Sequence, residues 1–270
     1  PAPNDHLELG NHSEFLSVIS SHQMIARWCI NDTSTFGTYR LKGHAVEPFW
    51  DWVSSWAAMC ALPSDISPEM SDEGYILPKL ENISHVVEVD VTVDRAEGML
   101  IRVPEMSATS IHKERRRTAE ARAERIVDIV RSEPNEPCVI WCETDYEAEP
   151  IARRLAGTDF RELHGSDSLS HKENTLDAFS AGNLTTLLTK PKIAGLGLNW
   201  QHCRRIVFAS ATFSFESWYQ AIRRCWRFGQ TREVIVDIIG TEGDKHVMAN
   251  LRRKAAAADQ MFTRLVEEMQ

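Results

Sequence analysis

Two arginines three residues apart, at the end of a predicted helix, have the charge and spacing that phosphate chemistry requires. The sequence predicts a helix over 215–226, on which Arg224 and Arg227 share one face with Gln220 one turn behind. Guanidinium groups held in this way can stabilise negative charge that develops on a phosphoryl group. A solvated basic helix is the plain alternative. The composite sequence QAIRRCWRFGQ (220–230), which closes on a Gly-Gln stop, favours the chemical interpretation.

A glycine-containing loop upstream is a second candidate for binding phosphate. The sequence KPKIAGLGLNWQ (190–201) follows the apolar stretch 184–189, which predicts a buried strand. Small residues such as Gly195 and Gly197 leave backbone amides open to a closely approaching phosphate. A dinucleotide fingerprint needs a third glycine and a following helix, whereas residues 205–209 read as extended. The loop therefore argues against a Rossmann-type site.

A short turn, His164-Gly165-Ser166, follows the weak predicted strand 160–163. Contact with a ligand is one interpretation of this turn. An internally satisfied turn explains the same residues equally well.

The order of strand, glycine loop, strand and arginine helix resembles motifs V and VI of the Swi/Snf-like branch of superfamily-two helicases and translocases. Motif VI reads Q-A-x-D-R-x-H-R-I-G-Q, and the matching residues here are Gln220, Ala221, Arg224, Arg227, Gly229 and Gln230; the departures are Arg223, Trp226 and Phe228. Motif V reads S-T-R-A-G-G-x-G-L-N-L, and the matches are Gly195, Gly197, Leu198 and Asn199, with Lys192 at the basic position and departures at Pro191 and Ala194. The turn at 164–166 resembles the D-G-S of motif IV, with His in place of Asp.

The resemblance implies a role for each matched residue. Arg224 and Arg227 would be the arginine-finger pair of an ATPase, an effect worth on the order of a thousandfold in rate, or about 4 kcal/mol. The expected nucleotide contacts are Gln220, Gly195, Gly197 and Asn199; the expected nucleic-acid contacts are Lys192, Gly165 and Ser166. The implied cofactor is ATP with Mg²⁺, whose ligands belong to a lobe outside this chain.

The N-terminal part extends the resemblance. PAPNDHLELG (1–10) resembles the sequence after motif III, and ILPKLENISHVVEVDVT (76–92) resembles the L-P-P-K segment that leads into the second lobe. We therefore expect residues 1–110 to be the end of lobe one with a helical connector, and residues 111–270 to be the C-terminal RecA-like lobe. The chain contains neither a G-x-x-x-x-G-K-[ST] loop nor a D-E-x-H run, so ATP hydrolysis would need the N-terminal RecA-like lobe as a partner. The sequence RLKGHAVEPFWDWVSSWA (40–57) resembles phage and bacterial members of the branch.

Alternating helical and extended patterns predict the fold class, an α/β fold with a RecA-like parallel sheet flanked by helices and preceded by a mostly helical connector. The expected helices are 13–30, 46–61, 113–131, 149–156, one opened by a capping box at Ser170 and Glu173, 215–226 and 244–268. The expected strands are 85–93, 138–142, 160–163, 184–189, 206–209 and 234–239. An aromatic cluster at Phe49, Trp50, Trp52 and Trp56 could stack bases, but its helical spacing favours a packed core.

Composition sets limits on the partners. The net charge of −9 argues weakly against nucleic acid, but residues 1–110 hold 6 basic and 16 acidic side chains, whereas 111–270 hold 24 and 23. No run approaches the roughly 18 apolar residues of a membrane helix, so no membrane partner is expected. The six scattered cysteines lack metal-site spacing and suit free thiols in a reducing cytoplasm, and no metal site is expected in this chain.

These patterns together predict the C-terminal part of an ATP-dependent helicase or translocase that acts on nucleic acid, with DNA favoured over RNA. The cell would be bacterial or phage-infected. The alternative is a non-catalytic orphan lobe that acts as a nucleic-acid or protein binding module. The sequence leaves open whether the substrate is duplex or single-stranded.

Overall fold

The structure, a computed structural model, describes residues 6–31, 39–58, 60–88, 108–194, 197–211 and 214–267. The chain divides into two compact units, one of residues 1–73 with 250–270 and the other of residues 74–249. All the predicted site residues fall in the range of the second unit. No helix in the described part of the chain is long and apolar enough to cross a membrane.

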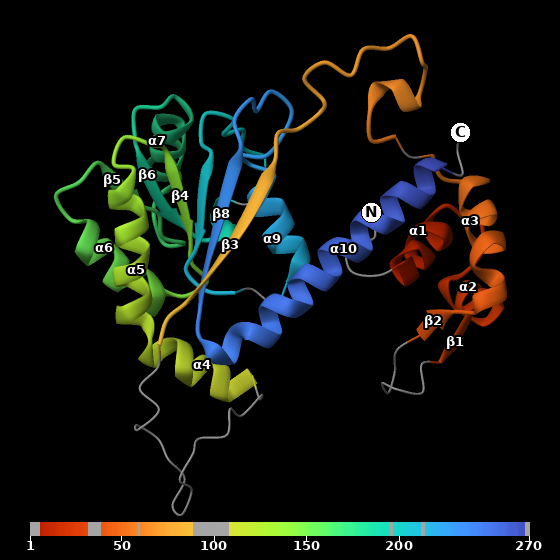
Figure 1. The fold of residues 1–270 in the computed structure, drawn as a ribbon, viewed down its shortest axis with the longest axis horizontal. Coiled ribbons are helices and arrows are strands. Elements are labelled where there is room, and N and C mark those ends of the chain that lie inside the picture. The colour runs from red at the N-terminus through yellow and green to blue at the C-terminus, as the bar shows by residue number, and fades with distance from the viewer. Residues whose placement is uncertain are drawn as a thin grey trace, which may run out of the picture. The chain divides into compact units, whose positions relative to one another are not determined.

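The second unit is built on a six-stranded parallel sheet in the order β3-β8-β7-β4-β6-β5 (Figure 1). Its strands are β3 (Leu80–Val86), β4 (Cys138–Trp141), β5 (Phe160–Glu162), β6 (Thr186–Thr189), β7 (Arg205–Phe208) and β8 (Val234–Gly240). Every residue of β4 and β6 is buried, as expected for central strands covered on both faces. The predicted fold class, a parallel α/β sheet flanked by helices, is confirmed.

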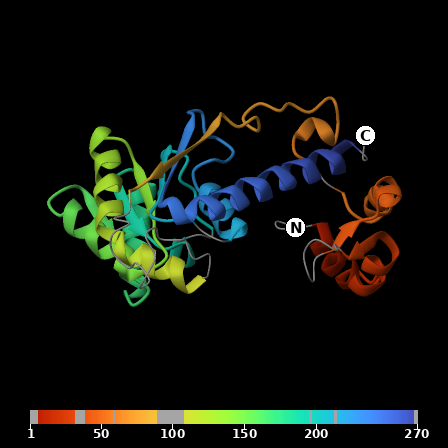
Figure 2. The same cartoon turned by 60° about the horizontal axis from the view of Figure 1, so that its bottom comes forward.

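Helices cover both faces of this sheet (Figure 1, Figure 2). The helical elements that begin in this unit are α4 (Ala108–Arg117), α5 (Ala119–Ser132), α6 (Asp145–Leu155), α7 (Leu169–Ser180), α8 (Pro191–Ala194), α9 (Phe215–Ile222), the 3-10 turn η4 (Glu242–Asp244) and α10 (Lys245–Glu267), which continues into the range of the first unit. On one face, Cys138 and Ile140 pack with apolar residues of α5 and α6. On the other face, the Trp141 ring lies 5.9 Å from that of Trp200, which in turn contacts Phe179 of α7.

Several predicted helix boundaries in this unit are wrong, and side-chain caps explain two of them. The predicted helix 149–156 starts earlier, because Thr144 and Glu147 form a capping box, and Pro150 consequently lies in the helix interior instead of the first turn. Helix α7 is capped by Ser168, whose hydroxyl accepts from the His171 amide at 3.3 Å, and not by the predicted box at Ser170. The predicted helix 113–131 is divided into α4 and α5 at Thr118.

The edge strand β3 comes from sequence that precedes the expected boundary at residue 110. Its seven residues pair in parallel with β8, from Leu80 opposite Val234 to Val86 opposite Gly240. The predicted strand 85–93 therefore begins earlier than expected, and its residues 89–93 lie outside the described part of the chain. The division at residue 110 stays a prediction about domain organisation.

The first unit has its own small core. It contains η1 (His6–Glu8), α1 (Leu9–Phe15), α2 (Ser21–Trp28), β1 (Cys29–Asn31), β2 (Tyr39–Leu41), η2 (Gly43–Ala45), α3 (Val46–Ser54) and η3 (Pro63–Asp65), and β1 and β2 pair antiparallel. The predicted single helix 13–30 is wrong, because Ser17 has a φ of 60° and Ser20 caps a new helix. Phe49 and Trp50 are buried, and the Trp28 and Trp52 rings stack at 4.3 Å. The preference for core packing over base stacking is thus supported.

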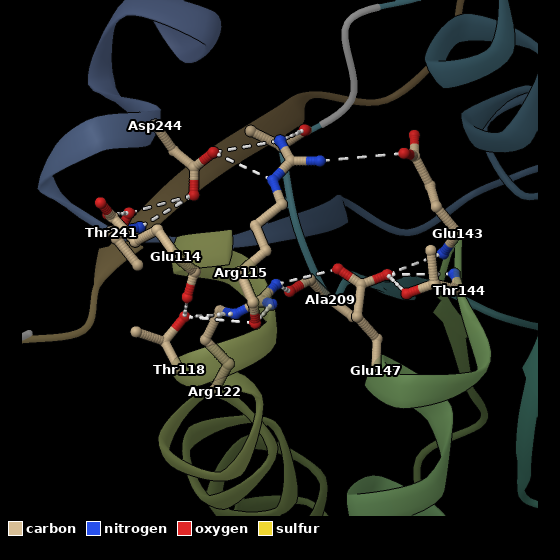
Figure 3. Close-up of polar contacts among 11 residues, drawn as sticks. Glu114, Arg115, Thr118, Arg122, Glu143, Thr144, Glu147, Ala209, Thr241 and Asp244 are labelled. Carbon is tan, nitrogen blue, oxygen red and sulfur yellow. Dashed lines mark hydrogen bonds and ion pairs between the residues drawn. The ribbon is translucent and has the colours of Figure 1, made fainter. Parts of the chain in front are cut away.

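A buried polar network joins the carboxyl ends of β4, β7 and β8 (Figure 3). Arg122, 1% exposed, donates to Glu147 at 3.0 Å and to the Ala209 carbonyl that follows β7. Arg115, also buried, donates to Asp244 at 3.0 Å and to the Ala211 carbonyl. The two arginines are linked, since Arg122 also donates to the Arg115 carbonyl.

Both carboxylate oxygens of Glu147 accept hydrogen bonds. One carboxylate oxygen pairs with Arg122, and the other accepts from the amides of Glu143 (3.0 Å) and Thr144 (3.2 Å). Removing one partner from such a buried ion pair leaves an uncompensated charge. The network therefore fixes the start of α6 against the end of β7.

We predict that Arg122→Met lowers the free energy of unfolding by about 3–5 kcal/mol, because Glu147 is left buried without its counter-charge. Urea denaturation followed by circular dichroism measures the change. Arg153→Met is the matched control, since its pair with Glu120 is solvent-exposed and contributes little. Equal effects of the two substitutions would contradict this account.

Lowering the pH should reduce the stabilisation that ionised Glu147 provides. Burial alone would raise the pKa of Glu147, but the charge of Arg122 and the hydrogen bonds from its neighbours bring that pKa below its ordinary value of 4.5. Ionised Glu147 therefore stabilises the fold above that value, and the contribution disappears as pH falls through the lower folded pKa. We expect the stability gap between wild type and Glu147→Gln to be widest near neutral pH and to narrow in acid. Denaturation series at neutral and acidic pH measure it; a constant gap argues against the assignment.

The cysteines of the chain are all free, and all but Cys60 are buried. Burial raises the pKa values of the Cys138, Cys142 and Cys225 thiols above their ordinary range. Among the described residues, no group of three His, Cys, Asp or Glu side chains is arranged to hold a metal ion.

Candidate nucleotide-binding site

The segment that carries the two candidate arginines begins with α9, but the helix ends before Arg224. The Ser214 hydroxyl caps the helix by accepting from the Ser217 amide at 3.2 Å. The prediction that the helix runs to Trp226 is wrong, since α9 ends at Ile222. The Arg224 carbonyl accepts from the Trp200 amide at 2.8 Å, and the amides of Arg224 and Cys225 donate three residues back, to Ala221 and Ile222, in place of helical bonds.

The glycine loop and the arginine segment nonetheless meet at one backbone carbonyl. Arg224 donates to Leu198 O at 3.4 Å, and Arg227 donates to the same oxygen at 3.2 Å. Arg224 is also held by Gln220, through the carbonyl at 2.9 Å and the side-chain oxygen at 3.1 Å. The structure therefore brings together three of the predicted residues, Gln220, Arg224 and Arg227, on the predicted glycine loop.

The electrostatics of this arginine pair are unusual. Arg224 is only 8% exposed, and burial lowers its pKa, as does repulsion from nearby Arg227, which is partly exposed. Among the described residues, neither guanidinium has a carboxylate within ion-pair distance, and Arg227 Nε is buried without a hydrogen-bond partner. An anion would stabilise two neighbouring cations arranged in this way.

The rest of the glycine loop is only partly described. Gly195 lies outside the described residues. Gly197 has a φ of +78°, a conformation in which a side chain is strained, and Asn199 is exposed beside it. The contact that joins loop and arginines is a backbone carbonyl, that of Leu198, which no side-chain pattern could have indicated.

The three predicted nucleic-acid contacts lie elsewhere, at the carboxyl ends of two adjacent strands. Gly165 and Ser166 form an exposed turn after β5, and Lys192 is exposed on the short α8 after β6. The turn satisfies part of its own polarity, because the His164 amide donates to Asp167 at 2.7 Å and Lys172 donates to the Gly165 carbonyl at 2.6 Å. A satisfied turn and a contact site both remain compatible with this geometry.

Gln230 anchors the end of the arginine segment. The sequence indicated this residue only as part of a helix stop. Its side chain is buried, donates to the carbonyls of Cys203 (3.2 Å) and Cys225 (3.4 Å), and accepts from the amides of Thr231 and Arg232. Every polar atom of the amide is therefore used in fixing the turn after Arg227.

Comparison with known proteins finds a family match in this part of the chain. Residues 121–229, less than half of the chain, match the family model described as "Helicase conserved C-terminal domain". This segment is therefore similar to helicase C-terminal domains. The match contains the arginine pair, the glycine loop and the turn at 164–166.

Two known proteins are similar to parts of this chain. An 82-residue stretch, 30% of the chain, is 26% identical to "DNA repair and recombination protein RAD26" of Saccharomyces cerevisiae (strain ATCC 204508 / S288c) and spans 8% of that protein. The solved structure titled "Crystal structure of the C-terminal part of Fun30 ATPase domain" aligns with a TM-score of 0.43 and 15% identity over 53% of each chain.

The loop conformation yields a matched pair of substitutions. We predict that Gly197→Ala lowers the free energy of unfolding by about 1–2 kcal/mol, because its positive φ disfavours a Cβ atom. Gly165→Ala should be nearly neutral, since Gly165 has no positive φ and a Cβ there meets no atom within 4 Å. Thermal denaturation of both variants tests the difference. Destabilisation by Gly165→Ala alone would contradict the assignment of strain to the loop.

Proposed function

We propose that this chain is the C-terminal part of an ATP-dependent helicase or translocase that acts on DNA. One observation carries the proposal: Arg224 and Arg227 converge on the Leu198 carbonyl without a carboxylate among the described residues. In this proposal the pair is the arginine finger, and Gln220 positions Arg224. Gly195, Gly197 and Asn199 would complete the nucleotide contacts. Lys192, Gly165 and Ser166 would contact the nucleic-acid backbone.

The residues present fit a triphosphate but not its metal. The buried, unpaired Arg227 Nε is a donor that a phosphate oxygen could satisfy. The described residues provide no cluster of acidic or imidazole ligands, so we assign the Mg²⁺ ligands to an N-terminal RecA-like partner lobe. Bound ATP·Mg²⁺ supplies the phosphoanhydride bond that is hydrolysed. The two guanidiniums of this chain would neutralise charge that develops on the transferred phosphoryl group.

The proposal also assigns the partner, the domain boundary and the cellular location. The yeast relative is named for DNA repair and recombination, which favours DNA as the partner. We assign residues 1–110 to the end of lobe one and the connector, and residues 111–270 to the C-terminal lobe. We place the protein in the cytoplasm of a bacterial or phage-infected cell. Both assignments follow from the Swi/Snf-like resemblance. Joined to the partner lobe it would hydrolyse ATP, and alone it would not.

We predict that Arg227→Ala in the full-length protein lowers ATP hydrolysis by about a thousandfold or more, because the transition state loses one of its two cations. DNA binding, measured by fluorescence anisotropy, should change little. A coupled ATPase assay gives the rate.

Arg131→Ala is the control for this experiment, because Arg131 is an exposed arginine on α5. Its ATPase rate should equal that of wild type. Turnover at the wild-type rate in Arg227→Ala would refute the arginine-finger role and favour a non-catalytic binding lobe.

A further inference from the structure

An exposed aromatic pair includes the residue that directly follows Arg227 in the chain. The side chains of Tyr75 and Phe228 are 48% and 52% exposed, and their ring centroids lie 4.7 Å apart at an interplanar angle of 48°. Ile76, which follows Tyr75, is exposed as well. Phe228 is the neighbour of Arg227 in sequence, so the backbone of the arginine segment continues directly into this apolar pair.

The two rings are held in place despite their exposure. Trp226 donates from its indole nitrogen to the Pro78 carbonyl at 2.7 Å, which fastens segment 74–79 to the arginine segment. Gln201 donates to the Phe228 carbonyl at 3.2 Å and fixes the backbone under the ring. Both contacts lie within the unit of residues 74–249. The rings therefore form a preorganised surface that loses little freedom on binding.

Gly74 shows how closely the backbone approaches the Phe228 ring. Its φ is +80°, and a Cβ atom at this position would lie 2.9 Å from Phe228 Cε2. A side chain at residue 74 would push the ring away. The close packing supports the ring from one side and leaves about half of the side chain in contact with solvent.

We propose that Tyr75 and Phe228 bind the base of the nucleotide whose phosphates the arginine pair receives, an inference that rests on the proposed function. Purine rings stack on exposed aromatic faces, and phosphates pair with guanidiniums. The site offers one concentrated point of positive charge, because both arginines converge on one carbonyl. A single nucleotide matches that arrangement better than a nucleic-acid strand, whose charge is spread along a backbone.

The test uses this 270-residue chain with ATP and with inorganic tripolyphosphate. Saturation-transfer NMR should show transfer from the protein to the adenine protons, and ³¹P line broadening should report phosphate binding.

Phe228→Ala and Tyr75→Ala should each weaken ATP binding by about tenfold and leave tripolyphosphate binding unchanged. Phe228→Tyr keeps an aromatic face and should bind ATP as wild type does. Both positions are exposed, so the variants should fold, which circular dichroism verifies.

The outcomes separate the two proposals. Tripolyphosphate binding that needs Arg227, with no saturation of adenine protons, would overturn the base site and leave the arginine-finger role standing. Absence of both signals would overturn the base site, whereas the arginine-finger role is decided by the ATPase rate of Arg227→Ala in the full-length protein. Saturation of thymine protons in a short oligothymidylate, with none of adenine, would overturn the nucleotide assignment in favour of a nucleic-acid strand.

Discussion

Two buried guanidinium groups at the carboxyl ends of β4, β7 and β8 hold the second unit together. Arg115 and Arg122 donate to the backbone carbonyls of Ala211 and Ala209, which follow β7, and to the acids Asp244 and Glu147. Charges this deep destabilise a fold unless every donor is used. The start of α5, the start of α6 and the turn before α10 are therefore fixed relative to one another.

The same side chain serves the opposite purpose in Arg224 and Arg227. Arg224 is also buried and Arg227 is partly buried, but the described residues around them provide carbonyl and amide oxygens instead of carboxylates. The contrast separates arginines whose charge is neutralised by carboxylates of the fold from arginines that no carboxylate among the described residues neutralises. Burial alone does not make this distinction, whereas the identity of the partners does.

The sequence predicted the sheet well because buried parallel strands are short apolar runs, as in 138–142 and 184–189. It predicted helix ends poorly, since the ends depend on which hydroxyl reaches an amide, as at Ser168, or on a distant amide, as at Trp200. Motif spacing indicated the arginine pair and the glycine loop. It could not indicate their meeting point, which is the backbone oxygen of Leu198, nor the network of Arg115 and Arg122, whose pattern also suits a solvated helix.

The burial of the cysteines has a practical consequence. Five of the six thiols lie inside the protein, and those of Cys138, Cys142 and Cys225 are held in their protonated form by burial, which removes the thiolate that reacts with electrophiles. Cys60 is exposed. A maleimide dye should thus attach at one position of the native chain, providing a fluorescent reporter without any engineered substitution.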